Sequence, residues 1–137
     1  MELADPAEGA SVAVATAYDE RFPCDTVIDG DPRTFWTTTG SYPHELVVQL
    51  GGTSSLETVQ TVTTNVRGLV VEGCQGPSPS GGSWDELYST ELEDTDGELT
   101  IDNQQIMRAT CDFVRVRIMS GWKENSTVHK ISIRGRK

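Results

Sequence analysis

The chain lacks the hydrophobic runs that mark membrane and secreted proteins. No stretch approaches the roughly 18 to 20 consecutive apolar residues that a membrane span requires. Residues 1–20 have no basic start and carry acidic residues on both sides of a short apolar run, so we expect no signal peptide. The sequence therefore predicts a cytosolic protein, and its length of 137 residues predicts one domain, covering residues 1–137.

Cysteine is scarce, and its spacing argues against two common kinds of stabilisation. The three cysteines, Cys24, Cys74 and Cys111, form no Cys-x-x-Cys pair. An odd count without a signal peptide is typical of reduced thiols. Structural zinc takes four Cys or His ligands in paired spacing, whereas the two histidines, His44 and His129, lie far apart in the sequence. We expect neither a disulfide framework nor a zinc site.

Positive charge is scarce over most of the chain and concentrated at its end. The net charge of −10 argues against nucleic acid as a partner. Residues 1–107 contain 19 acidic and 3 basic residues, a net charge of −16, whereas residues 108–137 contain 8 basic and 2 acidic residues, a net charge of +6. Either acidic and basic strands are neighbours in one sheet, or the basic end faces an acidic partner.

Recognisable catalytic motifs are missing as well. The segment "HELVV" at residues 44–48 lacks the second histidine of a zinc protease motif, and there is no Gly-x-Ser-x-Gly, phosphate-binding loop or dinucleotide fingerprint. Acidic residues are so numerous that no pair stands out as a general acid and base. Sequence alone does not place His129 beside Cys111. We therefore expect a protein that is not an enzyme.

What the chain does contain is a β pattern from end to end. Alternating apolar residues and many β-branched residues are typical of strands, and Gly, Pro, Asn, Asp and Ser cluster between them, as in a sandwich or barrel. One helical turn is expected at residues 23–30 and a flexible connection at residues 73–84. The predicted strands cover residues 11–18, 44–51, 56–66, 67–74, 84–93, 104–111, 112–121 and 128–135.

The last two predicted strands alternate apolar and basic residues. Arg115 and Arg117 point away from the apolar face of the first, and Lys130 and Arg134 point away from the apolar face of the second. If these strands are close neighbours, their outward residues form a basic stripe. The alternative is an ordinary solvated face.

The segment "IDGDPRTFWTTTG", residues 28–40, has the chemistry of a cation loop. Hard cations such as Ca²⁺ take six to eight oxygen ligands, and a tight turn supplies both carboxylates and main-chain carbonyls. Gly30 allows a sharp turn, and Thr34 offers its hydroxyl and its carbonyl oxygen. An EF-hand is excluded because the twelfth residue from Asp29 is Gly40 rather than glutamate. Local chemistry leaves a cation loop and a simple Asp-Gly-Asp-Pro turn as alternatives.

The motif at residues 29–36, "DGDPRTFW", together with the terminal "VHKISIRG", resembles the discoidin, or F5/8 type C, class of galactose-binding-like domains. The resemblance implies an all-β, discoidin-like jelly-roll sandwich. In that class the loop often holds a structural Ca²⁺. The implied ligands here are the Asp29 side chain, the Thr34 hydroxyl and carbonyl, and carbonyl oxygens of Asp31, Thr26 and Val128. Relatives often carry glutamate where this chain has Lys130, which implies a weaker site.

The segment "FWTTTG" followed by Pro-x-Glu, with "VH" before the last strand, is similar to the intraflagellar transport protein 25 family, also known as heat shock protein beta-11. This likeness covers essentially the whole chain. It implies a non-enzymatic subunit of the intraflagellar transport B complex in the cytoplasm and the cilium or flagellum. The implied partner is a Rab-like small GTPase, intraflagellar transport protein 27, bound as a heterodimer together with other subunits of the complex.

Two expectations about binding surfaces accompany this resemblance. The partner surface is predicted at Arg115, Arg117 and Met119. The alternative function is a glycan-binding discoidin-type module, in which Trp122 stacks on a sugar. Direct membrane insertion is not expected, since the loops carry few apolar residues and the net charge repels anionic lipid.

Overall fold

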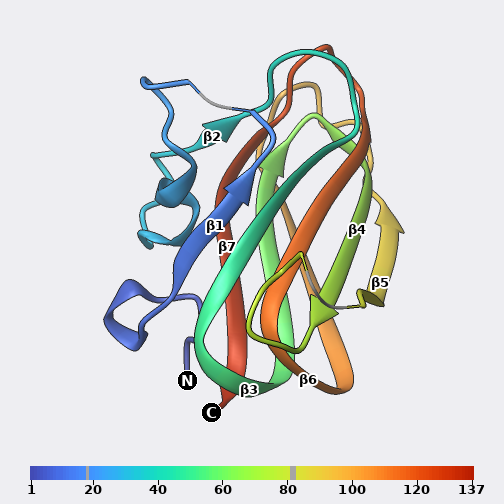
Figure 1. The fold of residues 1–137 in the computed structure, drawn as a ribbon. Coiled ribbons are helices and arrows are strands. Elements are labelled where there is room, and N and C mark those ends of the chain that lie inside the picture. Colours follow the sequence, from blue (N-terminus) through green and yellow to red (C-terminus); the bar gives the residue numbers. More distant parts are fainter. Residues whose placement is uncertain (18, 81–82) are drawn as a thin grey trace.

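Two antiparallel β-sheets face each other in the computed structural model, which describes residues 1–17, 19–80 and 83–137 apart from the side chain of Arg108 (Figure 1). The elements, in chain order, are η1 (Pro6–Glu8), β1 (Ser11–Ala15), η2 (Cys24–Ile28), β2 (Trp36–Thr37), β3 (His44–Thr64), β4 (Val66–Cys74), β5 (Asp85–Glu91), β6 (Thr100–Gly121) and β7 (Thr127–Arg136). The two η elements are single 3₁₀ turns. None of the helical segments described has the length and apolar composition to cross a membrane.

Strands β3 and β6 belong to both sheets, because each bends at the end of the molecule where the two chain termini lie (Figure 1). The first half of β3 pairs with β1 and with the second half of β6, and β6 continues to β4 and β5. We call this layer the front sheet. The second half of β3 pairs with the first half of β6 and with β7, which also pairs with β2. We call this layer the back sheet.

The bend of β3 depends on a glycine. The register between β3 and β6 shifts between Gln49 and Ser54. Within this interval a Cβ on Gly51 would lie 1.9 Å from the carbonyl oxygen of Glu8, so a larger residue would push the η1 turn away. Gly51 therefore permits the close approach of the N-terminal segment to the bend.

The core fills the space between the two sheets. Inward residues alternate with outward residues along each strand, as expected for a sandwich. Trp36 is only 1% exposed, and its indole Nε1 donates a hydrogen bond to the Ala17 carbonyl oxygen at 2.9 Å. The largest fully buried side chains of the core are those of Leu3, Val27, Trp36, Leu46, Val48, Val59, Leu69, Val71, Val114, Ile118, Ile131 and Ile133.

The structure confirms the predicted all-β sandwich and most of its strands. The helical turn expected at residues 23–30 is η2, and the strand expected at 11–18 is β1, although Tyr18 lies outside the described residues. Each long strand, β3 and β6, was predicted as two separate strands, because a bend and a loop both interrupt the strand pattern of the sequence. The two-residue β2 and the first residues of β6 were not predicted. Residues 81–82 of the connection expected at 73–84 also lie outside the described residues.

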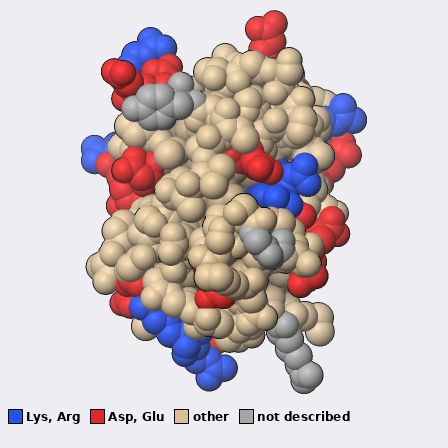
Figure 2. All heavy atoms as spheres, in the orientation of Figure 1, with Lys and Arg blue, Asp and Glu red and all other residues tan. Residues whose placement is uncertain are grey.

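The condition for a basic stripe is not met, because the two strands that would form it lie in different sheets. Arg115 and Arg117 lie on the part of β6 that pairs with β4 in the front sheet, whereas β7 lies in the back sheet. Instead, basic residues of the C-terminal part pair with acidic residues from earlier in the chain, as in Arg136–Glu57 at 3.3 Å. Figure 2 shows Lys and Arg beside Asp and Glu in small groups on one face. For such pairs, acidic and basic strands are therefore neighbours in one sheet, which is the first of the two alternatives for the uneven charge.

Candidate functional site

The candidate cation loop, residues 29–34, is held between two buried anchors. On one side, Val27 and Ile28 of η2 are 0% and 5% exposed, and on the other side Trp36 is 1% exposed. The main-chain N–H of Asp29 donates to the Thr26 carbonyl oxygen at 3.2 Å, which closes the turn. Gly30 has φ of +78°, a left-handed conformation that favours glycine. The packing of the anchors thus fixes the position of an exposed loop.

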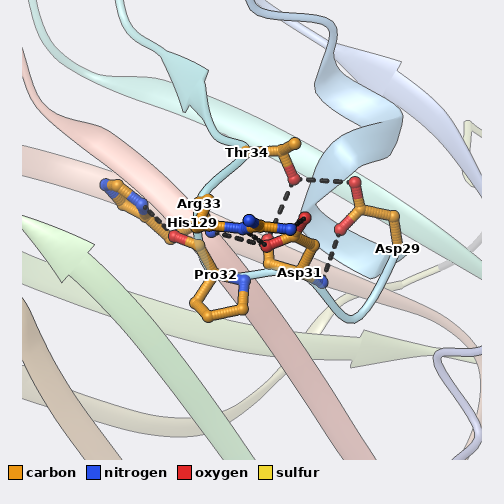
Figure 3. Close-up of polar contacts among 6 residues, drawn as sticks. All are labelled: Asp29, Asp31, Pro32, Arg33, Thr34 and His129. Carbon is orange, nitrogen blue, oxygen red and sulfur yellow. Dashed lines mark hydrogen bonds and ion pairs between the residues drawn. The ribbon is translucent and has the colours of Figure 1, made fainter.

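Three oxygen atoms converge inside this loop (Figure 3). The Thr34 hydroxyl oxygen lies 2.7 Å from Oδ2 of Asp29 and 2.9 Å from the carbonyl oxygen of Asp31. The other carboxylate oxygen of Asp29 accepts a hydrogen bond from the Asp31 main-chain N–H at 2.8 Å. Asp29, Asp31 and Thr34, which the sequence placed in one site, are therefore brought together.

The carboxylate of Asp31 points to a different partner. It accepts hydrogen bonds from Nε and Nη2 of Arg33, both at 3.1 Å, and from the Arg33 main-chain N–H at 2.9 Å. These bonds stabilise the ionised form and hold the pKa of Asp31 below its ordinary value. Because Arg33 already neutralises this side chain, Asp31 has its carbonyl oxygen left to offer, as the resemblance implied.

His129 joins the loop to the start of β7. Its Nδ1 lies 2.8 Å from the Pro32 carbonyl oxygen, so Nδ1 is the donor, and its Nε2 lies 2.9 Å from the Thr127 hydroxyl (Figure 3). Its ring packs against Phe35, with 4.9 Å between centroids. This contact was not predicted from the sequence, in which only the "VH" preceding the last strand singled the residue out. Cys111 lies elsewhere, in the core, where burial raises the pKa of its thiol to about 11.

The donors in this loop fit a hard cation in kind. They are a carboxylate, a hydroxyl and a carbonyl oxygen, the ligand types that Ca²⁺ prefers. Among the described residues, no group of three or more His, Cys, Asp or Glu side chains could hold a metal, so any cation would rely on carbonyl and hydroxyl oxygens. Lys130 lines the same 400 Å³ hollow as Asp29 and Gly30. A loop with one available carboxylate and an ammonium group nearby should bind a cation weakly, because the ammonium group repels the ion.

Val128, the ligand expected from β7, is buried and lies opposite Trp36 in the pairing of β2 with β7. It therefore belongs to the segment that His129 ties to the loop. Thr26 is at the other end of the site, where its carbonyl oxygen already accepts the Asp29 N–H. The structure thus places both residues at the borders of the loop rather than among its converging side chains.

Arg115, Arg117 and Met119 share the outer face of the front sheet. Arg115 lies 2.9 Å from Glu72, with its guanidinium 4.3 Å from the centroid of the Trp84 ring, and Arg117 lies 3.6 Å from Glu45. These pairs make a nearly neutral cluster. Met119 is 40% exposed. A partner contact at these residues remains a prediction.

Trp122, the candidate for sugar stacking, is built into the end of the sandwich. Its indole Nε1 donates to the Leu92 carbonyl oxygen at 3.0 Å, and the guanidinium of Arg67 lies 4.8 Å from the ring centroid. One face of the ring is therefore covered by an arginine. This arrangement favours a second interpretation of Trp122, a hydrophobic plug at the end of the sandwich, over a platform for a sugar.

Comparison with known proteins finds relatives that share one protein name and solved structures that share one fold. No family model matches the chain. It is 31% identical over 127 residues to intraflagellar transport protein 25 of Chlamydomonas reinhardtii, across 93% of this chain and 66% of that protein. It is also 30% identical over 135 residues to the intraflagellar transport protein 25 homolog of Mus musculus, across 98% of this chain and 93% of that protein.

Similar solved structures include carbohydrate-binding domains. A family 32 carbohydrate-binding module from NanJ of Clostridium perfringens, solved with galactose, superposes with a TM-score of 0.80 at 14% identity and covers 97% of this chain and 98% of that chain. A chitosan-binding module from a Paenibacillus chitosanase/glucanase superposes with a TM-score of 0.77 at 18% identity, across 98% of both chains. At such identities these neighbours establish the fold alone, and they confirm the expected discoidin-like, galactose-binding-like sandwich.

Proposed function

Because the chain belongs to the intraflagellar transport protein 25 family, we propose that it is a subunit of the intraflagellar transport B complex and forms a heterodimer with the Rab-like small GTPase intraflagellar transport protein 27. The match to the mouse relative carries this proposal, since it extends over 98% of this chain and 93% of that protein. A match over nearly the whole of both proteins supports a shared function more strongly than a match to a short motif does. The proposal places the protein in the cytoplasm and in the cilium or flagellum.

Two polar clusters of the structure connect parts of the fold to one another. Glu45 and Glu72 neutralise Arg115 and Arg117 on the front sheet. Asp112 accepts hydrogen bonds that connect the bend of β3 with the segment after β4. Each cluster has a structural use within the fold. A non-enzymatic subunit is the function that agrees with these uses.

We also propose that the loop at residues 29–34 holds a structural Ca²⁺. The Asp29 carboxylate and the Thr34 hydroxyl and carbonyl would hold it, with carbonyl oxygens of Asp31, Thr26 and Val128. A bound divalent cation would supply positive charge that draws these oxygens together. This role concerns the stability of one corner of the sandwich and is independent of the identity of the partner.

Co-purification tests the proposed heterodimer. The chain and the GTPase are produced together, and the molar mass of the eluted species is measured by light scattering during size exclusion. We expect one complex with one copy of each protein, and an unrelated Rab-like GTPase serves as the control. Elution of the chain at its own mass of 14.9 kDa beside free GTPase would contradict the heterodimer. Binding to an array of glycans in the same preparation would favour the carbohydrate-binding alternative.

A further inference from the structure

The first half of β6 is an edge strand that the rest of the described chain leaves uncovered. Residues 100–111 pair with β3 on one side, and no described strand pairs with their other side. The second half of β6, by contrast, lies between β3 and β4. The first half therefore presents a row of main-chain N–H and C=O groups at the border of the back sheet.

This edge also exposes apolar side chains. Leu99 just before the strand is 49% exposed, Ile101 is 62% exposed and Met107 is 91% exposed. Asp102, the only charged residue from 99 to 107, faces the interior opposite the fully buried Thr61. Natural edge strands are normally protected by charge, proline or short length. Over residues 99–107 this segment has no proline and no exposed charge, and its protections are the inward-facing Asp102 and the register shift between Gln105 and Ala109.

The edge of the front sheet shows the contrast within the same molecule. Strand β5 has seven residues, and three of them, Asp85, Glu86 and Glu91, are exposed acids. Such a short and charged strand resists further pairing. The chain therefore carries exposed charge on the β5 edge and leaves residues 99–107 of the β6 edge without it, a difference that is understandable if a partner covers the β6 edge.

The outer face beside this edge has a defined chemistry. Ile101 lies beside Val62, which in turn lies beside Lys130, and Gln105, Thr58 and Arg134 form a second such row. The centre of the face is thus uncharged, and its far border is basic. Among the described residues, neither Lys130 nor Arg134 forms an ion pair, although Lys130 lines a hollow together with Glu2, Asp5 and Asp29. Acidic groups on a partner would complement these two cations.

We propose that the edge at residues 100–107 receives an extended segment of the partner protein as an added strand. Apolar side chains of the added strand pack on Leu99, Ile101 and Met107. Acidic groups of the partner outside this strand lie over the outer face of the back sheet, at Lys130 and Arg134 on β7. Strand addition suits a free edge because main-chain hydrogen bonds supply affinity and alternate side chains supply specificity. A second copy of this chain is a poorer occupant, since each copy carries a net charge of −10. The inference rests on the heterodimer proposed above.

Two matched substitutions test the assignment with the purified GTPase as the binding partner. Ile101→Glu places a charge on the back-sheet edge, and Met119→Glu places the same charge on the front-sheet surface predicted from the sequence, so the pair compares two rival positions for the partner. We expect Ile101→Glu to raise the dissociation constant at least about tenfold, as for an interface centre, and Met119→Glu to change it less than about twofold. Arg134→Glu should weaken binding several-fold through the lost charge complementarity. Unfolding midpoints of all variants are measured alongside.

Hydrogen exchange of the unmodified pair gives a second readout that does not depend on the folding of a variant. The alternate amides of residues 100–107 that point away from β3 should exchange at least about tenfold more slowly in the complex, because an added strand pairs them. Unchanged exchange at these amides would overturn the inference, and so would loss of binding by Met119→Glu alone. Slower exchange that appears with rising concentration of the isolated chain would assign the edge to a second copy instead. Failure of the unmodified chain to bind the GTPase would count against the proposed heterodimer itself.

Discussion

At the scale of single residues, the polar contacts of the loop at 29–34 give its two carboxylates different partners. Asp29 and Asp31 are two residues apart, and each accepts a hydrogen bond from the main-chain N–H two positions later. Arg33 engages the side chain of Asp31, which leaves Asp29 with the Thr34 hydroxyl. Only one of the two carboxylates is therefore available to a cation.

Asp29→Ala should abolish the stabilisation by calcium. At a free Ca²⁺ concentration 100 times the dissociation constant, binding to the folded state alone contributes about 2.7 kcal/mol, which raises the unfolding midpoint by roughly 5–10 °C. Differential scanning fluorimetry in calcium and in chelator measures this shift. Asp94→Ala is the matched control, because Asp94 is exposed and accepts the Asp96 N–H at 2.9 Å in the same kind of turn. An equal midpoint of the unmodified chain in calcium and chelator would mean that the loop is only a turn.

Two buried threonines predict opposite effects of the same substitution. Both Thr61 and Thr38 are 0% exposed, but the Thr61 hydroxyl has no hydrogen-bond partner among the described residues, whereas the Thr38 hydroxyl accepts the Ser126 N–H at 2.9 Å. Thr61→Val should leave the free energy of unfolding unchanged or raise it by up to about 1 kcal/mol, and Thr38→Val should lower it by about 1–3 kcal/mol. Urea denaturation distinguishes them. A loss at Thr61 equal to that at Thr38 would reveal a partner for the Thr61 hydroxyl.

At the scale of elements, local pattern predicted which segments are strands but not how they are joined. Residues 44–51 and 56–66 each have a strand pattern, yet the structure joins them in β3, because the Gly51 bend redirects the chain without ending its pairing. The separation of β7 from the second half of β6 was also invisible, since alternation reveals the inward face of a strand but not its neighbours. For the cation loop, Asp29, Asp31 and Thr34 could be placed together from the motif. The contact of His129 with Pro32 could not, because 97 residues separate them.

Asp112 connects the bend of β3 with the segment after β4, and the stability that this connection contributes should depend on pH. Its carboxylate accepts from the Thr53 hydroxyl at the bend of β3 and from the Gly76 N–H after β4 at 2.8 Å. These bonds hold the pKa of Asp112 below its ordinary value, the Thr53 hydroxyl being the larger cause. The stability that they contribute is therefore present above the pKa of the unfolded chain, about 3.9, and is lost as the pH falls through the lower pKa of the folded protein.

A double-mutant cycle between Asp112→Asn and Thr53→Val measures this contribution. Because the carboxylate is exposed to solvent, we expect a coupling free energy of about 0.5–1 kcal/mol at pH 7. The coupling should decline below pH 4 and vanish once the folded carboxyl is protonated. Denaturation at a series of pH values gives both quantities. A coupling of the same size at pH 7 and pH 2.5 would show that ionisation of Asp112 is irrelevant.

At the scale of the whole molecule, the fold and the family carry different information. The sandwich is shared with carbohydrate-binding modules at 14–18% identity, so its architecture does not determine what it binds. The family comes from the match over the whole length to transport proteins. The uneven charge of the chain is largely resolved inside the molecule, as in the pairs of Arg115 with Glu72 and Arg136 with Glu57. Three described basic residues, Lys123, Lys130 and Arg134, form no ion pair, and the last two lie on β7, which β3 separates from the edge of β6.

Affinity capture from ciliated cells tests the central claim most directly. The tagged chain is recovered from cell extracts, and the enrichment of each associated protein over an untagged control is measured by quantitative mass spectrometry. The account predicts that the Rab-like small GTPase is recovered in near-equal amount with the chain, followed by other subunits of the intraflagellar transport B complex. Recovery of the intact chain without the GTPase and without any transport subunit would contradict it.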